Sequence, residues 1–142
     1  MQRKRVFLDS SVIIFGLEVQ DCNSALILDL VLERKIEAVT CEKVVKEVRH
    51  YFSRRRNRNY AFLIENLVKK NFYVIERRQI LENINEWKGR VKEKDLEQVA
   101  SLKKLGIKTL VAYDRDFEGL EEYTTPKQFL RSLNLKFYGR EY

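Results

Sequence analysis

A chain of 142 residues is expected to form a single domain, here 1–142, that buries about two thirds of its unfolded surface. The 28 Lys and Arg residues outnumber the 21 Asp and Glu residues, so the net charge is +7, a balance that favours polyanions such as nucleic acid. The single histidine, His50, argues against a zinc site or a Ser-His-Asp triad.

The first half of the chain alternates short apolar runs with segments of helical periodicity. Residues 5–9 form an apolar strand that runs into an aspartate, and Thr40 is a suitable N-cap for the helix that follows the second strand. In chain order, the predicted elements are strand 5–9, helix 23–34, strand 37–40, helix 41–52, helix 59–70 and strand 72–75.

The second half continues the alternation. Gly106 is a typical helix C-cap, and Pro126 suits the first turn of a helix. The predicted elements are helix 76–89, a helix from 93–95 to Gly106, strand 108–113, a helix from Pro126, and a last strand 135–138. Trp87 is assigned to the core or to a partner interface. Alternating strands and helices of this length predict an α/β fold, a three-layer sandwich with a mostly parallel central sheet.

Sequence features also bear on compartment and redox chemistry. The longest uncharged apolar piece, 10–17, is far shorter than the roughly 18 residues of a membrane span, so no membrane association is expected. Asp9 interrupts the apolar segment that a signal peptide would need, and we expect a cytoplasmic protein. Cys22 and Cys41 are isolated, which favours small buried side chains over a disulfide or a reactive thiol.

Acidic residues stand where predicted strands end or predicted helices face inward: Asp9, Glu47, Asp95, Asp114 and Asp116. Strands that both end in carboxylates suggest one acidic site assembled at the carboxyl edge of a sheet. Crowded carboxylates repel unless a cation compensates them, and hard cations such as Mg²⁺ or Mn²⁺ prefer oxygen ligands. The pattern fits metal-dependent phosphodiester hydrolysis, with simple helix or turn capping as the alternative for each aspartate.

Five segments resemble the PIN domain, the nuclease fold of the VapC-like toxins and of several RNA-processing enzymes. They are Phe7–Val12, Val44–Val48, Lys94–Ala100, Leu110–Phe117 and Thr124–Leu130, and their order and spacing agree over nearly the whole chain. The resemblance implies cleavage of RNA by an endonuclease that leaves 5′-phosphate and 3′-hydroxyl ends.

The same resemblance implies roles for the acidic residues. Asp9, Asp95 and Asp114 would bind Mg²⁺ or Mn²⁺, and Asp116 matches a further acidic position that also serves as a candidate metal ligand. Glu47 would ligate through water or position the nucleophile. A hydroxyl from Ser10 or Ser11 would lie beside the first aspartate.

Partners follow in part from the resemblance. Toxin members pair with an antitoxin and carry a two-helix arm between the second and third motifs, where this chain has the run Arg54–Arg58. The antitoxin partner and a homodimer therefore stay open. The basic cluster with its interleaved aromatic residues suits an RNA track, against the alternative of a solvated charged face. The candidate RNA-binding residues are Arg49, Arg54, Arg55, Arg56 and Arg58.

Two other functions are compatible with parts of this pattern. A catalytically inactive PIN-fold domain would bind RNA or act as a scaffold in RNA processing. A receiver domain with a phosphorylated aspartate would share the α/β order, but it would need paired acidic residues after the first strand, and Asp9 has no acidic neighbour.

Overall fold

The computed structural model describes residues 3–142 and contains a five-stranded sheet in the spatial order β3-β2-β1-β4-β5. All four neighbouring strand pairs are parallel, which confirms the predicted α/β architecture. The strands are β1 (Lys4–Leu8), β2 (Ile36–Cys41), β3 (Tyr73–Ile75), β4 (Leu110–Val111) and β5 (Tyr123–Thr124).

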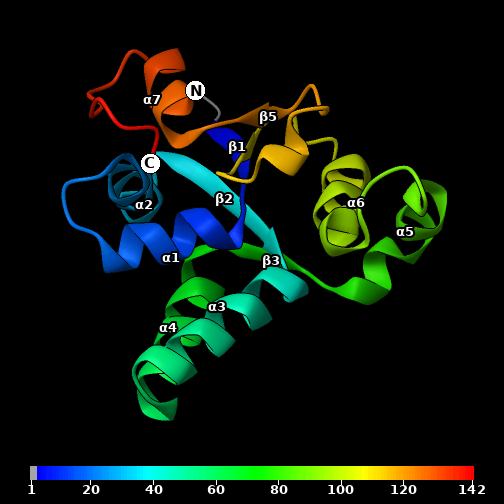
Figure 1. Ribbon diagram of the computed structural model, residues 1–142, viewed down its shortest axis with the longest axis horizontal. Helices are drawn as coiled ribbons and strands as arrows, with labels where there is room; N and C mark the ends of the chain where they lie inside the picture. The colour runs from blue at the N-terminus through cyan, green and yellow to red at the C-terminus, as the bar shows by residue number, and fades with distance from the viewer. Residues whose placement is uncertain (1–2) are drawn as a thin grey trace.

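Helices cover both faces of the sheet. They are α1 (Ser10–Glu18), α2 (Asn23–Leu32), α3 (Glu42–Arg55), α4 (Arg58–Asn71), α5 (Leu81–Trp87), α6 (Leu96–Leu105) and α7 (Pro126–Ser132). The chain moves outward from β1 to β3 and then returns past β1 to β4. Because such crossovers are right-handed, the outward and returning helices lie on opposite faces. Figure 1 shows α1, α2 and α7 grouped on one side, α5 and α6 on the other, and α3 with α4 extending as an arm.

The pairing of the two central strands positions the acidic residues. Val6, Phe7 and Leu8 are fully buried, as expected for a strand covered on both faces. Leu8 pairs with Val111, so β1 and β4 end side by side at the same edge of the sheet. The chain that leaves β1 therefore begins next to the chain that leaves β4.

Most of the predicted helices are present with nearly the predicted bounds. The helices predicted over 23–34, 41–52 and 59–70 correspond to α2, α3 and α4. Gly106 ends α6 in the left-handed conformation, at φ 63°, a region that favours glycine. The arginine run lies at the turn between α3 and α4, the two helices that extend from the sheet as an arm.

The strand predicted over 135–138 is wrong. The edge of the sheet is formed instead by β5, which pairs with β4 through Leu110 and Tyr123. The backbone near the C-terminus finds its partners on α2: Asn23 Oδ1 accepts a hydrogen bond from Tyr138 N at 2.6 Å, and Asn23 Nδ2 donates to Tyr138 O at 3.2 Å. A side-chain amide thus satisfies the groups that a neighbouring strand would otherwise satisfy.

Three smaller predictions about element ends are also corrected. Cys41, not Thr40, is the N-cap of α3, because the Thr40 hydroxyl donates instead to Leu8 O at 3.0 Å within the sheet. The helix predicted over 76–89 is divided into a 3₁₀ turn, Arg77–Ile80, and α5. The strand predicted over 108–113 is reduced to β4, since the sheet pairing ends where the chain turns into the acidic segment.

Both cysteines are free and buried, as predicted. Burial raises the pKa of Cys41 to about 12, which removes it as a thiolate nucleophile. No single helix within residues 3–142 has the length and apolar composition to cross a bilayer. The helices α1 and α2 reach that composition only as a pair, and they are bent by 97° relative to each other.

Candidate active site

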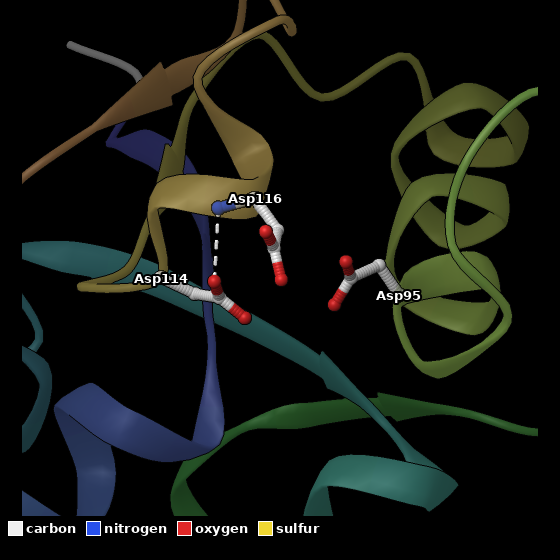
Figure 2. A group of neighbouring side chains, drawn as sticks. All are labelled: Asp95, Asp114 and Asp116. Atoms are coloured by element: carbon white, nitrogen blue, oxygen red, sulfur yellow. Dashed lines mark hydrogen bonds between the residues drawn. The ribbon is translucent and has the colours of Figure 1, made fainter.

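Three carboxylates from two distant segments meet at the carboxyl edge of the sheet. Asp95 precedes α6, while Asp114 and Asp116 follow β4. One carboxylate oxygen of each lies within 4.8 Å of the others, and Figure 2 shows the three side chains pointing toward one another. Asp95 is buried, Asp114 half-buried and Asp116 exposed, so the group is open to solvent on one side. Three of the four predicted metal ligands therefore lie together.

Of the three predicted site aspartates that precede a helix, only Asp114 caps it with its side chain. Asp9 is the N-cap of α1 and Asp95 that of α6, yet within residues 3–142 neither side chain makes a capping hydrogen bond. Asp114 does act as a cap, because its Oδ1 accepts a hydrogen bond from Asp116 N at 2.9 Å, the dashed line in Figure 2. Its Oδ2 points toward the centre of the group. The local geometry thus leaves carboxylate oxygens from all three segments free for other contacts.

Asp9 lies beside the three-carboxylate group and outside it. The Ser11 hydroxyl donates to Asp9 Oδ2 at 3.2 Å and accepts a hydrogen bond from Tyr113 N at 3.3 Å. This bridge ties the end of β1 to the end of β4, and it identifies Ser11 as the hydroxyl beside the first aspartate. Direct ligation of a metal by Asp9 stays a prediction.

Gln98 is a buried site residue that the sequence analysis did not single out. Its amide nitrogen lies 3.5 Å from Asp9 Oδ1. If the amide is turned over, its nitrogen donates to the carbonyls of Lys94 and Asp95 at 3.3 and 3.2 Å. The signal in the sequence is the spacing, because Gln98 lies one helical turn after Asp95.

Burial raises the pKa of two aspartates at this site, Asp9 and Asp95. Loss of hydration is the largest cause that raises the pKa of Asp9, and the charge of Asp114 adds to it. The pKa of Asp95 is also raised, chiefly by burial, with Lys94 opposing the shift and the other carboxylates reinforcing it. A cation that keeps these groups ionised would therefore be bound favourably.

Two lysines that the sequence analysis did not predict supply positive charge at this site. Lys94 Nζ lies 2.6 Å from Asp114 Oδ2 and 2.7 Å from Asp116 Oδ2. It is also 3.9 Å from Asp95 Oδ1. Lys92 Nζ lies 2.8 Å from Asp116 Oδ1, and this contact, followed by that of Lys94, lowers the pKa of Asp116 to about 2. The ammonium of Lys94 is thus the positive charge that all three carboxylates face.

Glu47 borders a groove on the α3 side, next to Ser10. The groove has a volume of about 560 Å³, and its lining includes Ser10, Glu47, His50, Tyr51, Arg54 and Arg55. Partial loss of hydration, followed by the charge of Asp9, raises the pKa of Glu47. A carboxylate with a raised pKa accepts a proton more readily than an ordinary glutamate.

The predicted RNA-binding arginines divide into two sets. Three of them make ion pairs with carboxylates: Arg49–Glu65 at 3.1 Å, Arg55–Glu18 at 3.9 Å and Arg56–Glu18 at 3.3 Å. Arg54 and Arg58 are exposed and make no ion pair among the residues described. The three arginine side chains are at least 41% exposed, whereas Glu18 and Glu65 are 15% and 11% exposed, so a phosphate can reach the guanidinium side of each pair.

The donor set of the three-carboxylate group fits a hard divalent cation. Oxygen atoms from three aspartates, without sulfur or imidazole, are ligands that Mg²⁺ and Mn²⁺ accept. The ammonium of Lys94 is a stand-in for such an ion, since it makes the charge-compensating contacts that an ion would make. An ion bound by all three side chains requires Lys94 to turn outward, which its 53% exposed side chain permits.

Comparison with protein families relates this arrangement to known proteins. Residues 5–116, which include all the predicted acidic site residues, match the sequence profile of the PIN domain. No curated protein matches the chain at a significant level.

Solved structures with a similar fold include several toxins and toxin–antitoxin complexes. VapC20 of Mycobacterium tuberculosis, described as a toxin that cleaves the sarcin-ricin loop, is 21% identical with a TM-score of 0.61, over 80% of this chain and 93% of that one. A toxin–antitoxin complex from Klebsiella pneumoniae is 14% identical with a TM-score of 0.66, over 85% and 97%. VapBC-1 of nontypeable Haemophilus influenzae is 15% identical with a TM-score of 0.58, over 94% and 96%.

Proposed function

The chain belongs to the PIN domain family, and on that premise we propose that it is a divalent-metal-dependent endoribonuclease, the toxin of a toxin–antitoxin pair. The observation that carries the proposal is the convergence of the carboxylates of Asp95, Asp114 and Asp116 within 4.8 Å. The similar structures support the toxin part of the proposal, because they include a toxin that cleaves the sarcin-ricin loop and toxin–antitoxin complexes.

In this proposal the acidic residues divide the work. Asp95, Asp114 and Asp116 would hold Mg²⁺ or Mn²⁺, with Asp9 completing the set from β1. A bound ion of this kind lowers the pKa of water and stabilises charge on an attacked phosphate. Glu47, whose pKa is raised, accepts a proton at its carboxylate beside that site.

The electrostatics of the protein suit an RNA substrate. The net charge of +7 attracts a polyanion, while the cleavage site itself is acidic. The groove beside Glu47 runs from Ser10 to Arg54 and Arg55, and guanidinium groups bind phosphate and stack on bases. We place the RNA strand in this groove.

An antitoxin partner is part of the same proposal. The toxin–antitoxin complexes among the similar structures support it, and α4 offers Phe62 and Leu63 with 60% and 64% of their surfaces exposed. Exposed apolar side chains that lie together often mark a protein interface. We also propose a homodimer and a cytoplasmic location, which are expected from the sequence.

One observation favours a second function, a catalytically inactive PIN-fold domain that binds RNA. Lys94 compensates Asp114 and Asp116 without a metal ion, so the acidic group can persist without metal binding. The receiver-domain alternative is not retained, because the family match assigns the same acidic segments to the PIN domain.

Incubation with mixed cellular RNA separates these two functions. With Mn²⁺ we expect cleavage into fragments with 5′-phosphate ends, and with chelator we expect intact RNA. The Asp9→Asn protein should fail to cleave in Mn²⁺ while it still binds RNA. Binding without cleavage by the wild-type protein would assign the inactive function, and cleavage that survives chelation would exclude the metal-dependent mechanism.

The salt dependence of RNA binding tests the groove. Replacing both Arg54 and Arg55 by alanine removes two phosphate contacts, so we expect the slope of log K against log salt to fall by about 1.4 for single-stranded RNA. The measurement is a titration of labelled RNA at several salt concentrations. The control is the double variant Arg131→Ala, Lys136→Ala, which removes the same charge from exposed positions at and beyond α7. Equal slopes in the two double variants would exclude the groove as the RNA path.

A further inference from the structure

A tight turn beside the acidic site holds the single tryptophan of the chain. Trp87 ends α5, and Arg90 N donates a hydrogen bond to Trp87 O at 2.9 Å. Lys88 has φ −57° and ψ 129°, and Gly89 has φ 83°, which are the angles of a type II β-turn. Glycine is the residue that this turn favours at its third position. The turn folds Arg90 back onto the tryptophan.

Arg90 lies over the indole ring of Trp87. Its guanidinium carbon is 4.0 Å from the ring centroid, while Lys103 lies 4.9 Å from the same ring. The indole itself packs against the core, so it gives the guanidinium a rigid support. Arg90 is exposed, and within residues 3–142 no carboxylate forms an ion pair with it. An exposed guanidinium held over an aromatic ring offers its outer side to a ligand.

The stacked pair borders a cavity that reaches the acidic group. The cavity has a volume of about 530 Å³ and includes Asp95 and Asp116 in its lining. Its other walls combine apolar and cationic side chains, and they include Trp87, Arg90, Val91, Lys92, Phe117 and Leu120. The groove beside Glu47 is separate from this cavity and lies on the α3 side, where Ser10, the residue after Asp9, is part of its lining. The cavity on the α5–α6 side contains two of the three clustered carboxylates in its own wall.

We propose that Arg90, supported by Trp87, is a stacking platform for a nucleobase of the RNA, next to the phosphate that is cleaved. This inference rests on the proposed function, and it adds a specificity-determining residue to the site. Bases of single-stranded RNA stack on guanidinium planes and aromatic rings. A further phosphate is a poorer occupant, because Lys92 is already paired with Asp116 and the walls formed by Val91 and Leu120 cannot solvate it. A neutral planar base meets neither obstacle.

The fluorescence of Trp87 reports directly on this platform, because no other tryptophan is present. The probe is a single-stranded RNA of about 12 nucleotides, titrated in chelator at low salt so that it is bound and not cleaved. We expect saturable quenching by this RNA. An oligomer of the same length with abasic riboses has the same phosphates, and we expect it to leave the fluorescence unchanged. Quenching of equal size by the abasic oligomer would assign a phosphate site and overturn the proposal.

Substitutions of Arg90 separate its shape from its charge. Loss of one stacked base weakens binding by about 10-fold, and we expect that loss in Arg90→Ala. Arg90→Lys should lose nearly as much, because an ammonium keeps the charge but has no plane to stack on. Arg131→Ala is the control for an exposed arginine away from the site. Wild-type affinity in Arg90→Lys would show that charge alone matters and would overturn the platform.

The fluorescence and cleavage assays can fail independently. RNA that is cleaved in Mn²⁺ but never quenches Trp87 would leave the proposed nuclease in place and remove the platform. Base-dependent quenching without cleavage would support the platform and reject the nuclease. Absence of any RNA binding, measured by anisotropy of labelled RNA, would overturn the platform as well.

Discussion

Replacing Asp95 by asparagine should lower RNA cleavage in Mn²⁺ by at least about 100-fold and, in metal-free buffer, should raise the melting temperature. The loss of activity is expected because Asp95 is the buried member of the acidic group, and even residues that only support a metal ligand typically cost 10- to 100-fold. The gain in stability is expected because an ionised carboxylate that is 4% exposed has lost most of its hydration.

The pH dependence of this gain has a definite sign. Burial raises the pKa of Asp95 above its ordinary value of 3.8, so the folded protein holds this proton to higher pH than the unfolded chain. Below pH 3.8 the carboxyl is neutral in both states and resembles asparagine. As the pH rises through the folded pKa, the wild-type protein loses stability that the variant keeps. The difference in melting temperature should therefore be small in acid and largest near neutral pH.

Calorimetry in chelator, from acid to neutral pH, measures the difference in melting temperature between the wild-type and Asp95→Asn proteins. Asp29→Asn is the matched control, because Asp29 is an exposed aspartate on α2. It should change neither cleavage nor melting temperature. A variant of Asp95 that melts lower than the wild type at neutral pH would assign the carboxylate a structural role, and the metal site would lose its buried ligand.

Replacing Lys94 by alanine should tighten the binding of Mn²⁺ by about 10-fold. The ammonium and the metal ion compete for the same oxygens, since Lys94 Nζ lies within 2.7 Å of both Asp114 and Asp116. In water, a unit charge and a divalent ion about 4 Å apart repel by about 2 kcal/mol. Part of this repulsion is avoided when the exposed side chain turns away, which leaves an effect near tenfold.

Isothermal titration with Mn²⁺ measures this effect without any need for activity. Lys104→Ala, an exposed lysine of α6 with no ion pair among the residues described, controls for the change in net charge. Weaker binding of Mn²⁺ by Lys94→Ala would show that Lys94 holds the aspartates in place for the ion. In that case the lysine would be part of the metal site and not a competitor for it.

Several parts of this site could be predicted from residues alone. Apolar runs that end in Asp9 and Asp114 indicate neighbouring parallel strands, and the carboxyl ends of such strands meet at one edge. The pairing of Leu8 with Val111 places the two segments side by side as expected. The convergence of Asp95 with the residues after β4 followed from the family resemblance, because spacing along the chain says little about contacts between a helix start and a distant loop.

Other parts depended on contacts that no local pattern contains. The segment 135–138 has the composition of a strand, but Asn23 on α2 satisfies its backbone. The five arginines look equivalent in sequence, yet Glu18 and Glu65 pair with three of them and leave Arg54 and Arg58 free of ion pairs among residues 3–142.

The sequence by itself determined the parallel α/β fold and the edge at which the acids gather, because strand burial and helix periodicity are local properties that repeat along the chain. Only the tertiary structure decided which charges meet there. Ion pairs such as Lys94–Asp114, and stacks such as Arg90 on Trp87, depend on distances between side chains set by turns and packing. Small differences in those distances select one partner among many residues of the same type.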